Sequence, residues 1–197
     1  IDNMVVAHEF GHYLHHRLQE CGTKQCGAMS EGWGDYNAAM MALRDGDNLD
    51  GVFSDSTYAS FDKTGYFGIR RVPYSADFTK NAYTFKHVTD GVALPNTHPV
   101  SPNGGPNSEV HNAGEIWCTA VWEGYTSLQK EADGQSFDEL NRAMSDYLVG
   151  GLMMTPTDAT FTETRDGILA TARAADEDHF LTLANAFARR GMGSCAV

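Results

Sequence analysis

The chain of 197 residues has no apolar run long enough to span a bilayer, no internal repeat and no low-complexity segment. We therefore expect one domain with a sizeable core and no membrane partner. Basic residues are scarce, because 14 lysines and arginines stand against 26 aspartates and glutamates and leave a net charge of -12. This negative charge argues against nucleic-acid binding and suits a soluble protein outside the cell.

The most informative feature that is present is the string His8-Glu9-Phe10-Gly11-His12, with Glu31 nineteen residues after its end. Residues four apart on a helix share a face, so the two imidazoles can converge on one ion while Glu9 points toward a water on it. A catalytic zinc takes three protein ligands and leaves a fourth position open, and Glu31 is the best-placed third ligand. Asp35, one helical turn further on, can accept the outer N–H of a ligand histidine.

This short motif could also arise by chance on an exposed helix. Its surroundings favour a buried helix instead, because apolar residues recur there at helical spacing. The residues of this apolar stripe are Val5, Val6, Phe10, Tyr13 and Leu14. Two imidazoles and a carboxylate in a tetrahedral set favour zinc, although cobalt or manganese could use the same ligands.

The two motifs together resemble those of the gluzincin, or thermolysin-like, metallopeptidases, and further strings point to the fungalysins within that clan. The first pair is His8 to His12 with Glu31-Gly32-Trp33-Gly34-Asp35. The further strings are Gly68-Ile69-Arg70, Pro73-Tyr74-Ser75, Val110 to Trp117, Met154-Thr155-Pro156, and Phe161 to Asp166 with Ile168-Leu169. The resemblance covers nearly the whole chain.

The resemblance implies a role for each residue of the site. The zinc ligands would be His8, His12 and Glu31, and the general base would be Glu9. Asp35 would be the carboxylate that lies behind a ligand histidine. His111 would donate to the oxyanion, and Arg70 would bind the substrate carbonyl. Taken alone, His111 could be an ordinary core histidine and Arg70 a surface charge. Pro106 stands where such enzymes carry the aspartate that orients the oxyanion histidine, so we expect Glu109 or a residue elsewhere to do this.

The implied protein is a secreted, zinc-dependent endopeptidase that hydrolyses peptide bonds with metal-activated water. Its expected fold is mainly α, a zincin-like C-terminal helical subdomain with long loops and few short strands. Residues 1–197 would form a single metallopeptidase domain that lacks the upstream β-rich subdomain, with a peptide or protein substrate and a propeptide as candidate partners. The alternatives are a catalytically inactive zinc-binding module and a gluzincin aminopeptidase, although no Gly-x-Met-x-Asn-type amine-binding motif is visible.

Four cysteines, at positions 21, 26, 118 and 195, show no zinc-finger spacing. In an exported hydrolase an even number predicts two disulfides. Cys21 and Cys26 bracket a short loop between the two zinc-bearing helices, which leaves Cys118 to pair with Cys195. Buried free thiols are the alternative.

Apolar periodicity predicts six helices, over residues 1–18, 29–43, 110–128, 137–152, 161–174 and 179–189. Ser136 and Thr160 are the expected N-caps of two of them. The segment 45–108 is expected to form loops that line the substrate cleft. Within it, residues 45–51 offer three carboxylates and an amide, which fits either a calcium loop or an ordinary acidic turn. Three aromatic residues are expected in the core: Trp117, Trp122 and Tyr125.

Overall fold

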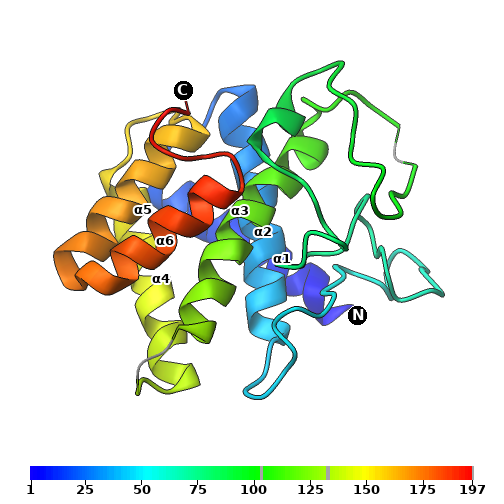
Figure 1. Cartoon of the computed structure of the whole chain (residues 1–197). Coiled ribbons are helices and arrows are strands. Elements are labelled where there is room, and N and C mark those ends of the chain that lie inside the picture. Colours follow the sequence, from blue (N-terminus) through cyan, green and yellow to red (C-terminus); the bar gives the residue numbers. More distant parts are fainter. Residues whose placement is uncertain (103, 132–133, 197) are drawn as a thin grey trace.

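The computed structural model describes residues 1–102, 104–131 and 134–196, which form helices and irregular loops (Figure 1). The described helices are α1 (Asn3–Leu18), α2 (Lys24–Ala42), η1 (Phe85–Val88, a 3-10 helix), α3 (Val110–Lys130), α4 (Phe137–Met154), α5 (Phe161–Ala175) and α6 (Glu177–Arg189). Within these ranges the β-pairing is limited to two isolated bridges, Phe53 with Tyr74 and Asp55 with Gly68. The predicted mainly α fold is confirmed. Among the described helices, none combines the length and apolar composition needed to cross a membrane.

Helices α2 and α3 form the centre of the molecule, with α1 packed on α2 and α6 on α3 (Figure 1). Helices α4 and α5 complete the helical side, and the long segment between α2 and α3 lies on the other side. The core aromatics predicted from the sequence are confirmed, because Trp117, Trp122 and Tyr125 on α3 are fully buried.

Local capping signals set most helix starts. Ser136 and Thr160 cap α4 and α5 as predicted, each in a capping box with the glutamate three residues later. The predicted start of α2 near Met29 is wrong, since the helix begins at Lys24. Thr23 is the N-cap there, and its hydroxyl accepts from the Cys26 backbone N–H at 3.2 Å.

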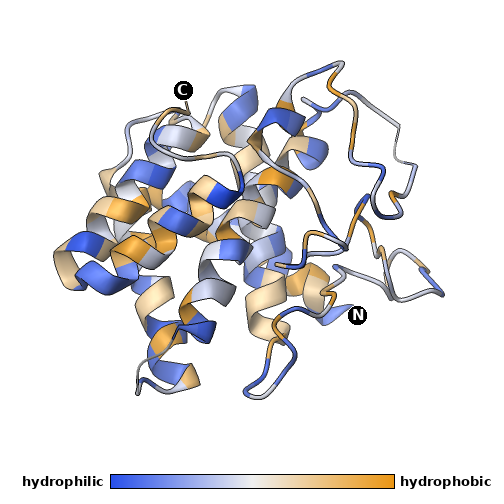
Figure 2. Ribbon diagram, in the orientation of Figure 1, coloured by the Kyte–Doolittle hydropathy of each residue, from blue (hydrophilic) through white to orange (hydrophobic). Residues whose placement is uncertain are grey.

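Helix α1 buries a different face from the predicted one. Its buried residues are Ala7, Gly11 and His15, which lie four apart and face α2. A Cβ on Gly11 would lie 2.7 Å from Gly34 Cα, so the two helices touch through glycine. More than half of the surface of three predicted core residues is exposed: Val6 (56%), Phe10 (53%) and Tyr13 (61%). Figure 2 shows apolar residues on this helix near the N-terminus.

One of the two predicted disulfides is present. Cys21 is bonded to Cys26, which joins the connecting loop to the first turn of α2. The predicted Cys118–Cys195 disulfide is wrong, and both thiols are free. Cys118 is fully buried among the core residues of α3, whereas Cys195 is exposed near the C-terminus, so the tail is not tied to that helix.

Candidate metal centre

Three predicted ligands line one pocket of about 200 Å³. His8 and His12 come from α1 and Glu31 from α2, and their ligand atoms all lie within 4.8 Å of one another. Each histidine Nε2 is 3.6 Å from an oxygen of the Glu31 carboxylate. Zinc bonds of about 2.0–2.2 Å in tetrahedral geometry separate ligand atoms by roughly 3.4 Å. The separations from each histidine to Glu31 are therefore close to those around a tetrahedral zinc ion.

Hydrogen bonds at Nδ1 fix the orientation of both histidine rings. His8 Nδ1 donates to Asp35 Oδ1 at 2.8 Å. His12 Nδ1 lies 2.8 Å from Ser30 Oγ, a contact that the sequence analysis missed. With Nδ1 as the donor in each ring, Nε2 is left bare toward the pocket, which is the tautomer that a metal requires. Ser30 directly precedes Glu31 on α2, so one helical turn supplies both Glu31 and the hydrogen-bond partner of His12.

Glycines in the second motif let α2 approach both neighbouring helices. A Cβ on Gly34 would lie 2.6 Å from Cε1 and Nδ1 of His8, closer than real Cβ atoms approach. A Cβ on Gly32 would lie 2.6 Å from the Gly114 carbonyl oxygen of α3. The second motif therefore needs glycine at these two positions so that α2 can pack closely against α1 and α3.

A buried ion-pair network surrounds Asp35. Arg70 donates to both of its oxygens, from Nε and from Nη2, each at 2.7 Å, and the Tyr74 hydroxyl also donates to it. Burial alone would raise the pKa of Asp35, but the Arg70 charge and the hydrogen bonds from His8 and Arg70 hold this pKa far below its usual range. Arg70 also lies 3.2 Å from Glu31 Oε2. It is only 6% exposed, so the alternative of a surface charge is wrong.

The carboxylates around His8 favour a positive charge on its ring. Burial disfavours a charged His8, but the Asp35 and Glu31 carboxylates outweigh burial and raise the pKa of His8 to about 10. Burial and the neighbouring His8 charge lower the pKa of His12. The pKa of Glu31 is lowered, because its histidine and arginine neighbours outweigh burial. The carboxylates that hold a proton on His8 are suited to hold a cation in its place.

Asp55 is a further carboxyl group that the sequence analysis did not identify. It is 2% exposed, its Oδ2 lies 3.8 Å from His8 Nδ1, and Ser56 Oγ donates to its Oδ1 at 2.8 Å. Burial and the Asp35 charge raise the pKa of Asp55 to about 8. Gly68 permits this placement, because its φ is +63° and a Cβ there would overlap the Asp55 carbonyl oxygen. No local pattern around Asp55 signals the contact.

Glu9 and His111 reach the same pocket from different helices. His111 lies in the first turn of α3, with its side chain about half exposed and its Nε2 3.4 Å from Glu31 Oε1. The alternative of a core histidine is therefore wrong. Glu109 Oε1 accepts from His111 Nδ1 at 2.8 Å, while its Oε2 accepts from the backbone N–H groups of His111 and Asn112. The N-cap of α3 thus also orients the His111 ring.

The long segment after α2 contributes four residues to this pocket: Asp55, Ser56, Ile69 and Arg70. Its acidic stretch, residues 45–51, forms an ordinary turn in the structure. Asp47 accepts from the Arg44 backbone N–H, and Asp50 pairs with Lys130 at 2.6 Å. In the described part of the chain, the groups of histidine, cysteine and acidic side chains close enough to share a metal all include His8. The calcium interpretation of this turn therefore gains no support.

Comparison with known proteins gives matches along nearly the whole chain. The family model described as Fungalysin metallopeptidase matches residues 1–196. Extracellular metalloproteinase 2 of Arthroderma gypseum is 30% identical over an alignment 211 residues long. The alignment covers 96% of this chain and 30% of that protein. The protein of the same name from Arthroderma otae is 29% identical with the same coverage. Extracellular metalloproteinase mep of Aspergillus terreus is 28% identical, covering 98% of this chain and 30% of that protein. The chain thus spans 30% of the length of these relatives.

Proposed function

The chain belongs to the fungalysin metallopeptidase family, and from this membership and its site we propose that it forms the metal-binding part of a secreted zinc endopeptidase. The observation that carries the proposal is the meeting of His8, His12 and Glu31 with Glu9 and His111 in one pocket. The names of the relatives support an extracellular location and a protein or peptide substrate. In this proposal residues 1–197 belong to one metallopeptidase domain.

Zinc is the proposed cofactor, because two imidazoles and one carboxylate at tetrahedral spacing suit it. When bound, zinc supplies Lewis acidity, which lowers the pKa of a bound water and polarises a carbonyl group. His8, His12 and Glu31 would hold it, with Asp35 and Ser30 fixing the two rings.

The remaining chemistry is assigned to side chains around the metal. Glu9 accepts a proton from the attacking water, because it lines the pocket and directly follows the proposed ligand His8 in the sequence. With a proton on each ring nitrogen, His111 donates from Nδ1 to Glu109 and from Nε2 to the oxyanion that develops on the substrate carbonyl. Arg70 lines the pocket as well, and we propose that it binds a substrate carbonyl while its other nitrogens hold Asp35.

Replacing Glu9 by glutamine tests this function directly. Glu9→Gln should retain zinc and lower hydrolysis of casein by a factor of roughly 10² to 10⁴, because an amide cannot accept the proton. His12→Ala is the matched control on the same helix and should lose the zinc itself. Wild-type turnover in Glu9→Gln would rule out Glu9 as the base.

A second measurement separates the alternative functions. The zinc-loaded chain should cleave casein internally and leave amino-acid anilides intact. Cleavage of the anilides alone would indicate an aminopeptidase. A zinc-loaded chain that cleaves neither substrate would indicate an inactive zinc-binding module.

A further inference from the structure

A hydrogen-bond relay of His12, Ser30 and His16 runs from the metal pocket to the surface of α1. His12 Nδ1 lies 2.8 Å from Ser30 Oγ, and the same oxygen lies 3.1 Å from His16 Nε2. Ser30 is 3% exposed, whereas His16 is exposed, one helical turn after His12. The buried hydroxyl therefore joins two imidazoles, of which only His12 lines the metal pocket.

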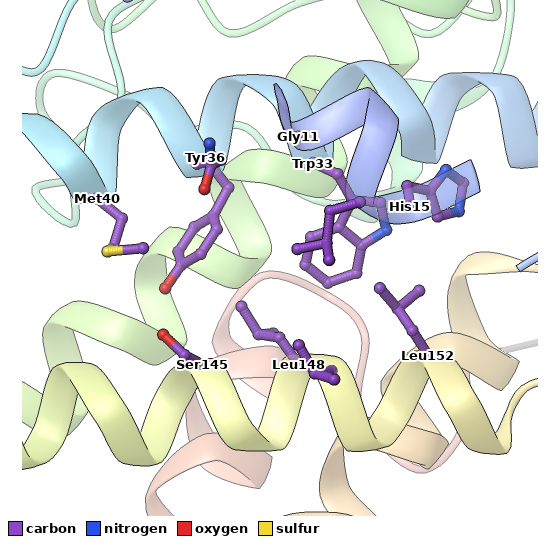
Figure 3. Close-up of a pocket in the computed structure, with 11 residues that line it drawn as sticks. Gly11, His15, Trp33, Tyr36, Met40, Ser145, Leu148 and Leu152 are labelled. Carbon is purple, nitrogen blue, oxygen red and sulfur yellow. The ribbon is translucent and has the colours of Figure 1, made fainter. Parts of the chain in front are cut away.

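The neighbouring His15 is not part of this relay. It lies on the buried face of α1, beside a small apolar cavity between α1, α2 and α4 (Figure 3). That cavity shares no lining residue with the metal pocket, and His15 Nε2 pairs with Gln19 Oε1 at 2.8 Å. Within the described residues, Ser30 Oγ has hydrogen-bond contacts with His12 and His16 and none with His15.

The tautomer of His12 decides the direction of the hydrogen bonds in this relay. Metal binding at Nε2 requires the ring proton on Nδ1, which then donates to Ser30. The Ser30 hydroxyl needs an acceptor of its own, because a buried donor without a partner is unfavourable. In the described part of the chain, the remaining partner of Ser30 Oγ is His16 Nε2, so the hydroxyl donates to that nitrogen.

The acceptor on His16 matters more with a metal bound than without one. In the metal-free chain the proton of His12 can move to Nε2, and Ser30 can then donate to the bare Nδ1 of His12. A bound metal removes this alternative, and His16 then has to accept. The partner of His8 has no such requirement, because the Asp35 carboxylate only accepts.

We propose that His16 is a positioning residue for the zinc ligand His12 and that it acts through Ser30 as the last acceptor of the relay. This inference rests on the zinc site of the proposed function. Donation from Ser30 to His16 makes Ser30 Oγ a better acceptor for His12 Nδ1, because linked hydrogen bonds polarise one another. The relay thus holds His12 Nε2 toward the pocket and raises its basicity toward a metal.

Two substitutions of His16 test the relay through the Kd for zinc, measured by competition with a chromophoric chelator. His16→Leu removes the acceptor and keeps water away from Ser30, so the Kd should rise by roughly 3- to 10-fold, the effect of one hydrogen bond. His16→Gln is the matched control, because its Oε1 can accept from Ser30, and it should stay within a factor of about two of the wild type. Equal affinities of the wild type and His16→Leu would overturn the proposal.

Two further measurements separate this role from a merely structural one. His16→Leu should leave the melting temperature of the metal-free chain near that of the wild type, because Ser30 can donate to His12 there. In a Ser30→Ala background, His16→Leu should cause no further loss of zinc affinity, because the relay is already broken. A loss as large as in the wild-type background would show that His16 acts by another route and would overturn the proposal.

Nitrogen-15 NMR of the zinc-loaded wild-type chain reads the direction of the relay without any variant. At an alkaline pH at which free histidine is neutral, His16 should carry its proton on Nδ1 and have a bare Nε2. A proton on His16 Nε2 would overturn the proposal, even if a variant fails to fold. A wild-type chain that binds no zinc would refute the proposed function together with this inference. Zinc binding that is unaffected by His16→Leu would refute this inference alone.

Discussion

Replacing Gly34 by alanine should weaken zinc binding although no ligand is altered. The added Cβ would lie 2.6 Å from two atoms of the His8 ring and 2.8 Å from a third, so the ring must rotate or α1 must move away from α2. Either movement disturbs the 2.8 Å hydrogen bond from His8 Nδ1 to Asp35. Losing such an outer partner typically costs 10- to 100-fold in metal affinity, or about 1.4–2.7 kcal/mol. Overpacking should also destabilise the fold by about 1–3 kcal/mol, against about 1 kcal/mol gained from the helix propensity of alanine.

Gly27→Ala is the matched control for this prediction. Gly27 lies on the same helix, but its added Cβ would meet only Val110 Cγ1 at an ordinary contact distance of 3.6 Å. This variant should keep wild-type zinc affinity and gain up to about 1 kcal/mol of stability from helix propensity. Zinc affinity is measured by competition with a chromophoric chelator, and folding by circular dichroism. The steric reasoning is refuted if folded Gly34→Ala binds zinc within a factor of about two of the wild type, or if both variants lose affinity equally.

Three further predictions concern single side chains. Asp35→Asn should lower the free energy of unfolding in urea by about 3 kcal/mol at neutral pH, because the buried Arg70 charge loses its two-point carboxylate partner and keeps only Glu31 at 3.2 Å; an unchanged midpoint would contradict this. His111→Ala should lower kcat and kcat/KM together by roughly two to three orders of magnitude at unchanged zinc content, whereas a raised KM alone would indicate ground-state binding. The pKa of His15 is about 4 in the folded chain against 6.5 for the free side chain, so the unfolded chain binds the proton first. The contribution of His15 to the free energy of unfolding should be complete above pH 6.5 and should fall by about 3 kcal/mol as the pH drops to 4. Urea titrations of His15→Gln should lack this part of the pH dependence.

The parts of the fold that could be predicted from sequence are those set by neighbours along the chain. Helices α4 and α5 begin at Ser136 and Thr160 because a hydroxyl and a glutamate three residues later satisfy the first backbone N–H groups. His8 and His12 share a helix face for the same kind of local reason, since four residues make about one turn. These features need no knowledge of what packs against the helix.

The features that were mispredicted depend on a partner element. The apolar residues of α1 indicated its buried face wrongly, because the contact with α2 is made where Gly11 and Gly34 allow the backbones to meet. Ser30 and Asp55 touch the ligand histidines, but which serine or aspartate does so is decided by how α2 and the following loop fold back. The even number of cysteines predicts a disulfide between Cys118 and Cys195. That number carries no information on burial, and in the structure Cys118 is buried while Cys195 is exposed.

The charges around His8 indicate that the loop after α2 is part of the proposed metal centre. Two ionised carboxylates, Glu31 and Asp35, lie within hydrogen-bonding or ion-pair distance of this one ring. Arg70, from the loop, pairs with Asp35, and burial beside Asp35 raises the pKa of Asp55, from the same loop, to about 8. A dication that takes the place of the proton on His8 would meet the Glu31 carboxylate and two imidazole nitrogens, a donor set that suits it. The two helices supply the donor atoms, and the loop sets how much charge those atoms present.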